Sequence, residues 1–337
     1  MIDRSAVHAN NAILQWLWRH GWEEPIGPLG PLLGKLGEDH PARLLWDVLG
    51  EFDLTPFFAQ TRSAEGATGR SVLSPRMKLT LWLFAIADGV GSARRIAALT
   101  TTHHAYRWIV GDLAIGHHAL SEFRAAHGAA FDALFTDLLS HLMHRGLIDM
   151  AVMGQDGTRV RAAAGAPSFR SWGSLLECRA QAELHLEAVL AQGDDPELSK
   201  AQKARRVSAA KDYRRRVEEA IAACKEQREQ RPESVARGST TDAEARVMKM
   251  ADGGFRPAFN AQLAVDASTQ LIAAVAITNS GSDMRQMSPM HQDIQHRYGT
   301  TPDHWLADGG FTALQAIDEV TARGPQPVVP PPRSRNP

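Results

Sequence analysis

Apolar and polar positions recur with two different periods along the chain, and the change falls near residue 147. Before it, apolar side chains recur at helical spacing, and Gly- or Pro-rich turns separate the runs. Ser74 followed by Pro75 predicts a helix start, because Ser is favoured as an N-cap and Pro at the first helical position. We expect helices over residues 12–18, 43–52 and 77–87, one beginning near 92, one ending at 108–110 and one over 121–142, with a loop over 61–69.

Beyond residue 147, short apolar runs bounded by turn residues predict strands. The first, over 147–155, is expected to end at Asp156. A helical block over 174–228 follows, broken at 193–196 by the turn of a helical hairpin. The remaining elements are expected in the order strand 259–266, turn 267–270, strand 271–278, helix 288–298, strand 304–307, helix 312–323 and a last strand from 328. This order predicts an α/β fold with a mixed sheet.

The composition is that of an ordinary globular protein, with 44% hydrophobic and 22% charged residues. No apolar stretch approaches the roughly 18 residues that span a bilayer, and the start of the chain lacks a basic segment followed by an apolar one. Cys178 and Cys224 are not spaced as a CxxC pair, which argues against a disulfide framework or a cysteine-rich zinc site. We therefore expect a cytoplasmic protein with no membrane segment.

The net charge of −1 does not indicate a nucleic-acid-binding protein, yet basic residues are concentrated in one segment. Residues 200–228 include only four acidic residues but ten basic ones: Lys200, Lys203, Arg205, Arg206, Lys211, Arg214, Arg215, Arg216, Lys225 and Arg228. A basic stripe of this kind can follow DNA phosphates, and it can equally be the solvated face of a helical hairpin. Both alternatives stay open for the arginines of this segment.

Two aspartates are expected where strands end, Asp156 after the first strand and Asp308 after the fourth. In an open α/β sheet, ligands gather at the carboxyl ends of the strands. Carboxylates hold Mg²⁺ while leaving it several waters or phosphate oxygens, and such ions assist phosphodiester cleavage at both the attacking and the leaving oxygen. Asp followed by Gly is also ordinary turn chemistry, so the pattern alone leaves both interpretations open. Asp266, at the end of the second strand, could lie near such metal ions, but the favoured expectation is that it caps a turn.

Motifs in a fixed order resemble those of bacterial insertion-sequence DDE transposases. In the second half they are Asp156-Gly-Thr-Arg-Val-Arg-Ala, Phe255-Arg-Pro-Ala-Phe-Asn-Ala-Gln-Leu-Ala-Val-Asp and Trp305-Leu-Ala-Asp308-Gly-Gly-Phe. Upstream, the helical N-terminal domain of the same family is resembled by Ser74-Pro-Arg-Met-Lys-Leu, Gly91-Ser-Ala-Arg-Arg-Ile, Tyr106-Arg-Trp-Ile-Val-Gly and His118-Ala-Leu-Ser-Glu-Phe-Arg. Each motif is weak alone, and their order along the chain carries the resemblance.

The resemblance implies a helical N-terminal region followed by an RNase H-like catalytic domain. Such a domain cleaves and joins DNA at the terminal inverted repeats of an insertion sequence, and we expect it to act as a homodimer. The expected boundaries are a helical N-terminal segment over 1–72, a helical domain over 73–146 and a catalytic domain over 147–337, with a helical hairpin inserted at about 168–235.

The resemblance also implies a metal site made of two aspartates and a glutamate that bind two divalent ions, Mg²⁺ or Mn²⁺. Asp156 matches the first aspartate and Asp308 the second. Arg159 and Arg161 would then contact DNA phosphates near the metals, or merely cover the edge of the sheet. Arg205, Arg206, Arg214, Arg215 and Arg216 would contact DNA from the helical insertion.

The chain departs from the family pattern at the glutamate, which family members carry on a helix beyond the last strand. After Val329 the sequence runs only through Pro330 to Pro337, and Glu319 lies on the helix directly after Asp308, too early in the topology. We therefore expect a truncated chain that lacks the C-terminal part of the core and is inactive or nearly so alone. The alternative function is that of a non-catalytic DNA-binding fragment or a repressor of its own element.

Overall fold

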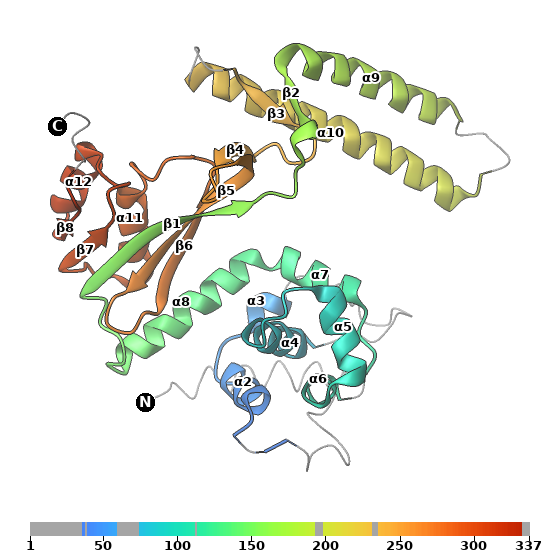
Figure 1. Ribbon diagram of the computed structural model, residues 1–337. Helices are drawn as coiled ribbons and strands as arrows, with labels where there is room; N and C mark the ends of the chain where they lie inside the picture. The colour runs from blue at the N-terminus through green and yellow to red at the C-terminus, as the bar shows by residue number, and fades with distance from the viewer. Residues whose placement is uncertain are drawn as a thin grey trace. The chain divides into compact units, whose positions relative to one another are not determined.

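The computed structural model describes residues 36–37, 39–58, 74–111, 113–192, 198–230 and 235–331. The chain divides into two compact units, residues 1–138 and 139–337 (Figure 1). The helix expected over 12–18 and the loop expected over 61–69 lie outside the described residues. No described helix combines the length and the apolar character that crossing a membrane requires.

The first unit is helical and surrounds one hydrophobic core, in which Met77, Leu81, Trp82, Tyr106 and Leu120 are buried. Its helices are α2 (Pro41–Leu49), α3 (Thr55–Phe58), α4 (Pro75–Ala87), α5 (Ala93–Thr102), α6 (His104–Val110), α7 (His117–Ala126) and the start of α8 (Gly128–His144). The single helix predicted over 121–142 is wrong, because α7 and α8 are separate. His127 interrupts them with φ −112° and ψ 28°, and its Nδ1 lies 2.8 Å from the carbonyl oxygen of Phe123.

The predicted helix start at Ser74 and Pro75 is confirmed in position but not in its capping bond. Pro75 occupies the first turn of α4, whereas Ser74 is buried and its side chain makes no cap hydrogen bond. The side chains that do cap neighbouring helices are Ser92, which accepts from Arg95 at the start of α5, and His103 at the start of α6.

The second unit is built on a six-stranded mixed sheet, and its strands are β1 (Val152–Arg161), β4 (Arg246–Lys249), β5 (Phe255–Asp266), β6 (Ile272–Thr278), β7 (His304–Ala307) and β8 (Gln326–Val328). The strand order is β4-β5-β1-β7-β8, with β6 also paired to β5. β1, β4 and β6 run antiparallel to β5, while β7 runs parallel to β1 and β8 parallel to β7. This arrangement confirms the expected mixed α/β, RNase H-like sheet, which follows a helical N-terminal region in the sequence.

The two faces of this sheet differ. One is covered by α11 (Met287–Tyr298), whose Met287, Met290, His291 and Ile294 are buried. Beside α11 lies α12 (Leu314–Thr321), which also contacts β8. The opposite face carries large apolar side chains that remain exposed: Val160, Val275, Ile277 and Val328. The predicted helices over 288–298 and 312–323 are therefore confirmed, and they show which side of the sheet is its core.

A helical hairpin is inserted in the chain between the sheet strands β1 and β4 (Figure 1). It consists of α9 (Trp172–Ala191) and α10 (Lys200–Gln230), with the 3₁₀ turn η2 (Ala166–Ser168) and the small sheet of β2 (Phe169–Ser171) and β3 (Arg237–Ser239) at its base. Gly238 of β3 packs so closely on α10 that a Cβ there would overlap with the carbonyl oxygen of Ala220. The hairpin is a packed element, with Leu175, Ala220 and Cys224 in its own small core.

Candidate active site

Asp156 lies in the middle of β1, so the prediction that the first strand ends there is wrong. Pairing of β1 with β7 ends at Gln155 and Ala307, whereas pairing with β5 continues to Arg161. Antiparallel pairing on one side therefore carries the strand past Asp156. The parallel neighbour stops just before it, so that edge of β1 is left unpaired from Asp156 onward.

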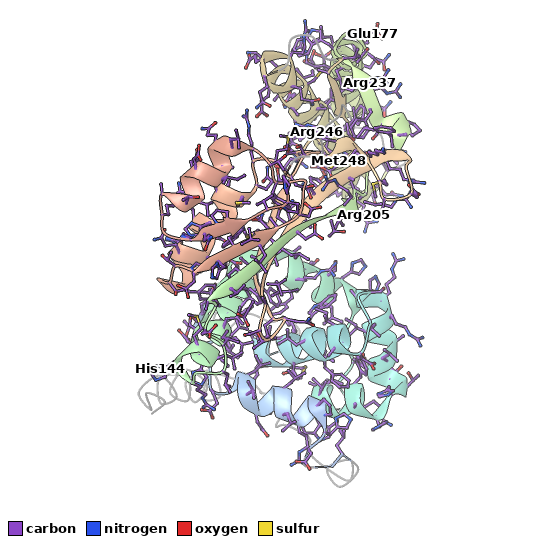
Figure 2. The ribbon with its side chains drawn as sticks, turned by 60° about the vertical axis from the view of Figure 1, so that its left-hand side comes forward. His144, Glu177, Arg205, Arg237, Arg246 and Met248 are labelled. Carbon is purple, nitrogen blue, oxygen red and sulfur yellow. The ribbon has the colours of Figure 1, made fainter. Side chains whose placement is uncertain are left out.

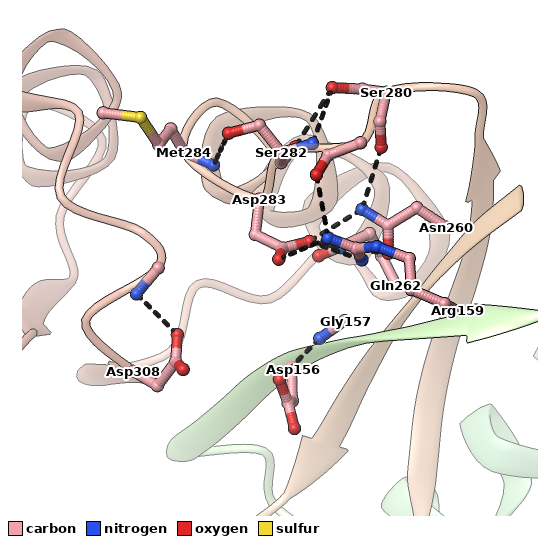
Figure 3. A network of polar contacts seen from close by, with 12 residues as sticks. Asp156, Gly157, Arg159, Asn260, Gln262, Ser280, Ser282, Asp283, Met284 and Asp308 are labelled. Carbon is pink, nitrogen blue, oxygen red and sulfur yellow. Dashed lines mark hydrogen bonds and ion pairs between the residues drawn. The ribbon is translucent and has the colours of Figure 1, made fainter. Parts of the chain in front are cut away.

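Asp308 follows β7 directly, and the register brings it beside Asp156. Gln155 pairs with Ala307, so the next residues of the two parallel strands occupy adjacent positions, and neighbouring strands lie about 4.8 Å apart. Both aspartates line one open depression of about 760 Å³, together with Gly154, Leu263 and Leu306. The structure thus brings together the two carboxylates that the sequence placed far apart (Figure 3).

Both carboxylates are exposed and each is oriented by a backbone amide just after it. The N–H of Gly157 donates to Asp156 Oδ1 at 2.7 Å, and that of Gly310 donates to Asp308 Oδ1 at 2.8 Å. Within the described part of the chain, the second oxygen of each accepts no hydrogen bond. Each aspartate therefore keeps an oxygen that can bind a cation or a ligand in the depression.

Arg159 points to the sheet face opposite Asp156 and binds a third aspartate. Its guanidinium lies 3.1 Å from Asp283 Oδ2 and also donates to the carbonyl oxygen of Gly281 at 3.0 Å. Asn260 and Gln262 donate to Asp283 Oδ1 as well, at 2.7 and 2.6 Å (Figure 3). Burial opposes ionisation of Asp283, but donation from these three side chains outweighs it and keeps the pKa of the carboxyl below its usual value.

Sequence reasoning missed Asp283, although one signal in the sequence pointed to it. Asn260 and Gln262 alternate within residues 257–265 of β5, a stretch that is otherwise apolar, and both are buried. Buried amides need hydrogen-bond partners, so this pair of positions required a polar partner on the same face. The partner comes from a Ser- and Gly-rich loop, which reads as an ordinary connection in the sequence.

Asp266 and Arg161 are in surroundings different from those of Asp156 and Asp308. Asp266 is buried, and its Oδ2 accepts from the Oγ of Ser268 at 2.6 Å and from both the amide and the hydroxyl of Thr269. This confirms the predicted turn-capping role. Arg161 is exposed at the end of β1, and its contact with DNA stays a prediction, as does that of Arg159.

The basic segment lies on α10, and its arginines are not equivalent. Arg214 forms an ion pair with Glu218, and Arg215 pairs with both Asp212 and Glu219. In contrast, Arg205, which Figure 2 labels, and its neighbour Arg206 are exposed on the first turns of the helix. No acidic partner reaches either of them in the described part of the chain. Arg216, half-buried, lines a hollow beside the base of the hairpin.

Comparison with known proteins gives two matches to family models. Residues 31–126 match a model described as Transposase domain (DUF772), and residues 221–336 match one described as Transposase DDE domain. The second match contains Asp283 and Asp308, whereas Asp156 lies before it. A search of curated proteins found no match, and neither did a search of solved structures. Both halves of the chain therefore match transposase domains, in the order that the motifs predict, which confirms the predicted resemblance to the DDE transposases of insertion sequences.

Proposed function

We propose that this chain carries out metal-dependent DNA cleavage and strand transfer at the ends of an insertion sequence. The observation that supports this proposal is the placement of Asp156 and Asp308 at adjacent positions of parallel strands, where they line one open depression. Two carboxylates that neighbouring strands hold in one place in this way can share a bound cation. Assembly as a homodimer and recognition of terminal inverted repeats are part of the proposal.

The residues of the depression fit Mg²⁺ or Mn²⁺. Mg²⁺ is bound in proteins through one or two carboxylates while it keeps several waters or phosphate oxygens. Asp156 and Asp308 each offer one uncommitted oxygen on an exposed side chain. A divalent cation bound there supplies polarisation of a phosphoryl oxygen and activation of the attacking oxygen.

The chain's own contribution is to orient these carboxylates and to leave room for a DNA strand. The amides of Gly157 and Gly310 hold one oxygen of each carboxylate, and both aspartates line the depression. Because β7 ends at Ala307, β1 has a free edge beside the depression, along which a substrate backbone can lie. Water, and then a DNA 3′-hydroxyl, would be the nucleophiles.

The described residues include no group of three acidic, histidine or cysteine side chains suited to a metal ion. Two carboxylates give a cation fewer protein ligands than the three that the family resemblance implies. We therefore expect weak metal binding and slow cleavage from these 337 residues alone. Arg205 and Arg206 are the basic residues that we propose for phosphate contacts, because no acidic group in the described structure neutralises them.

Cleavage of a supercoiled plasmid that carries the DNA flanking the reading frame tests the proposal. With Mn²⁺ we expect slow nicking at the element boundary, and Asp156→Asn or Asp308→Asn should abolish it. Asp303→Asn, an exposed aspartate just before β7, is the matched control and should nick like the wild type.

The rival function is that of a DNA-binding repressor, and the presence of only two grouped carboxylates favours it. Binding to the element ends without nicking, unchanged by Asp156→Asn, would support the rival. Nicking that persists in both Asp156→Asn and Asp308→Asn would exclude these residues as the site.

A further inference from the structure

The sheet face opposite Asp156 carries a buried chain of polar side chains that connects the two strands of the site. Trp305 Nε1 donates to Gln155 Oε1 at 3.1 Å, and Gln155 Nε2 donates to Gln262 Oε1 at 2.9 Å. Gln262 in turn donates to Asp283 Oδ1 at 2.6 Å. Trp305, Gln155 and Gln262 are all nearly inaccessible to solvent. Buried amides and indoles are stable only when they are bonded, so these contacts constrain one another.

Asp283 is the ionised acceptor at which this series of hydrogen bonds ends. It accepts from Arg159 on β1 and from Asn260 and Gln262 on β5, which are antiparallel neighbours. Arg159 also binds the carbonyl oxygen of Gly281, two residues before Asp283. The loop that carries Asp283 is therefore attached to the two central strands by charged hydrogen bonds, which are stronger than neutral ones.

The same aspartate lies against the segments that follow both site carboxylates. A Cβ on Gly157, the residue after Asp156, would overlap with Asp283 Oδ1 and Gln262 Nε2, so the close approach requires glycine. On the other side, a Cβ on Gly310 would lie 3.8 Å from the Cβ of Asp283. Asp283 thus lies between β1 and the turn after Asp308.

We infer that Asp283 is a positioning residue, which holds β1 and the 308–310 turn at the separation that lets Asp156 and Asp308 share one divalent cation. This inference rests on the metal site of the proposed function. Asp283 does not itself bind the cation, because its carboxylate is engaged by Arg159, Asn260 and Gln262 on the opposite face of the sheet. Its effect on the site passes through Gly157 and Gly310.

Titration of the 337-residue chain with Mn²⁺ alone, followed by electron paramagnetic resonance of the free ion, tests the inference without any DNA. Asp283→Asn should weaken Mn²⁺ binding by about 10- to 100-fold, the range found when residues that orient metal ligands are changed. Asp252→Asn is the matched control, because it breaks the exposed Asp252–Arg256 ion pair of the same sheet, and it should leave binding unchanged. Thermal unfolding of each variant, followed by circular dichroism, reports separately on folding.

Asp156→Asn in the same titration separates the two proposals. If it binds Mn²⁺ like the wild type, the metal site fails and the inference fails with it. If binding is lost in Asp156→Asn but unchanged in a folded Asp283→Asn, only the inference is overturned. Should Asp283→Asn not fold, Asp283→Glu decides: it keeps the charge that Arg159 requires but moves the carboxylate by one methylene. Weaker Mn²⁺ binding by Asp283→Glu supports the positioning role, and unchanged binding overturns it.

Discussion

The two faces of the six-stranded sheet differ in what their side chains do. On the face beneath α11, Trp305, Gln155 and Gln262 are buried and bonded to one another. The other face carries both site aspartates beside apolar side chains that remain exposed, such as Val275 and Ile277. The buried hydrogen bonds and the two candidate site aspartates thus lie on opposite faces of one sheet.

This difference follows from the geometry of a strand. Successive side chains point to opposite faces, so Gln155 joins the buried chain of hydrogen bonds while Asp156 faces the depression. The same holds on the neighbouring strand, where Trp305 lies in the core and Asp308, three residues later, lies in the depression. The backbone that carries each candidate site aspartate therefore also carries a buried residue of the other face, Gln155 on β1 and Trp305 on β7.

Trp305→Ala should have the largest effect, because it removes a fully buried side chain and leaves Gln155 without its donor. We expect the free energy of unfolding of the second unit to fall by about 3–5 kcal/mol, as for other buried aromatic residues. Urea denaturation followed by circular dichroism measures it. Leu314→Ala, at a position that is 75% exposed on α12, is the control, and it should change stability by less than about 0.5 kcal/mol. Equal losses in the two variants would contradict the assignment of the core to this face.

Lowering the pH should reduce the stability that the buried face of the sheet gains from the ionised carboxylate of Asp283. The pKa of this carboxyl is lowered in the folded state from its ordinary value of 3.8, so its contribution to stability is present above that value and is lost as the pH falls through the folded pKa. The stability difference between wild type and Asp283→Asn should therefore shrink as the pH is lowered from about 4 toward the folded pKa. Urea midpoints across this range measure the difference. A difference that stays constant down to the lowest pH would show that the charge of Asp283 contributes nothing.

Ile277→Thr on the open face should have the smallest effect. Ile277 is 61% exposed on β6, and Thr keeps the β-branched shape that strands favour, so we expect a change within about 0.5 kcal/mol. The same denaturation experiment tests it, beside Trp305→Ala. A loss approaching that of a core residue would show that this face is covered and would remove the contrast between the two faces.

Much of the second unit could be predicted because its elements are short apolar runs bounded by turn residues. The strands over 259–266 and 304–307 and the helix over 288–298 were expected and are present as β5, β7 and α11. The small strands β2, β3 and β4 were not expected, since their few residues carry no clear alternation. The extent of β1 was also missed, because only its pairing with β5 keeps it extended beyond Asp156.

The sequence by itself indicated the family, the main elements of the second unit and the two aspartates within recognisable motifs, because these depend on residue types at close spacing. Only the tertiary structure decided that Asp156 and Asp308 lie side by side and that Asp283 lies beneath them. Asp283 is separated from Arg159 by 124 positions. A contact between residues so far apart is set by strand register and by the packing of α11, and neither leaves a local pattern around an aspartate in a loop.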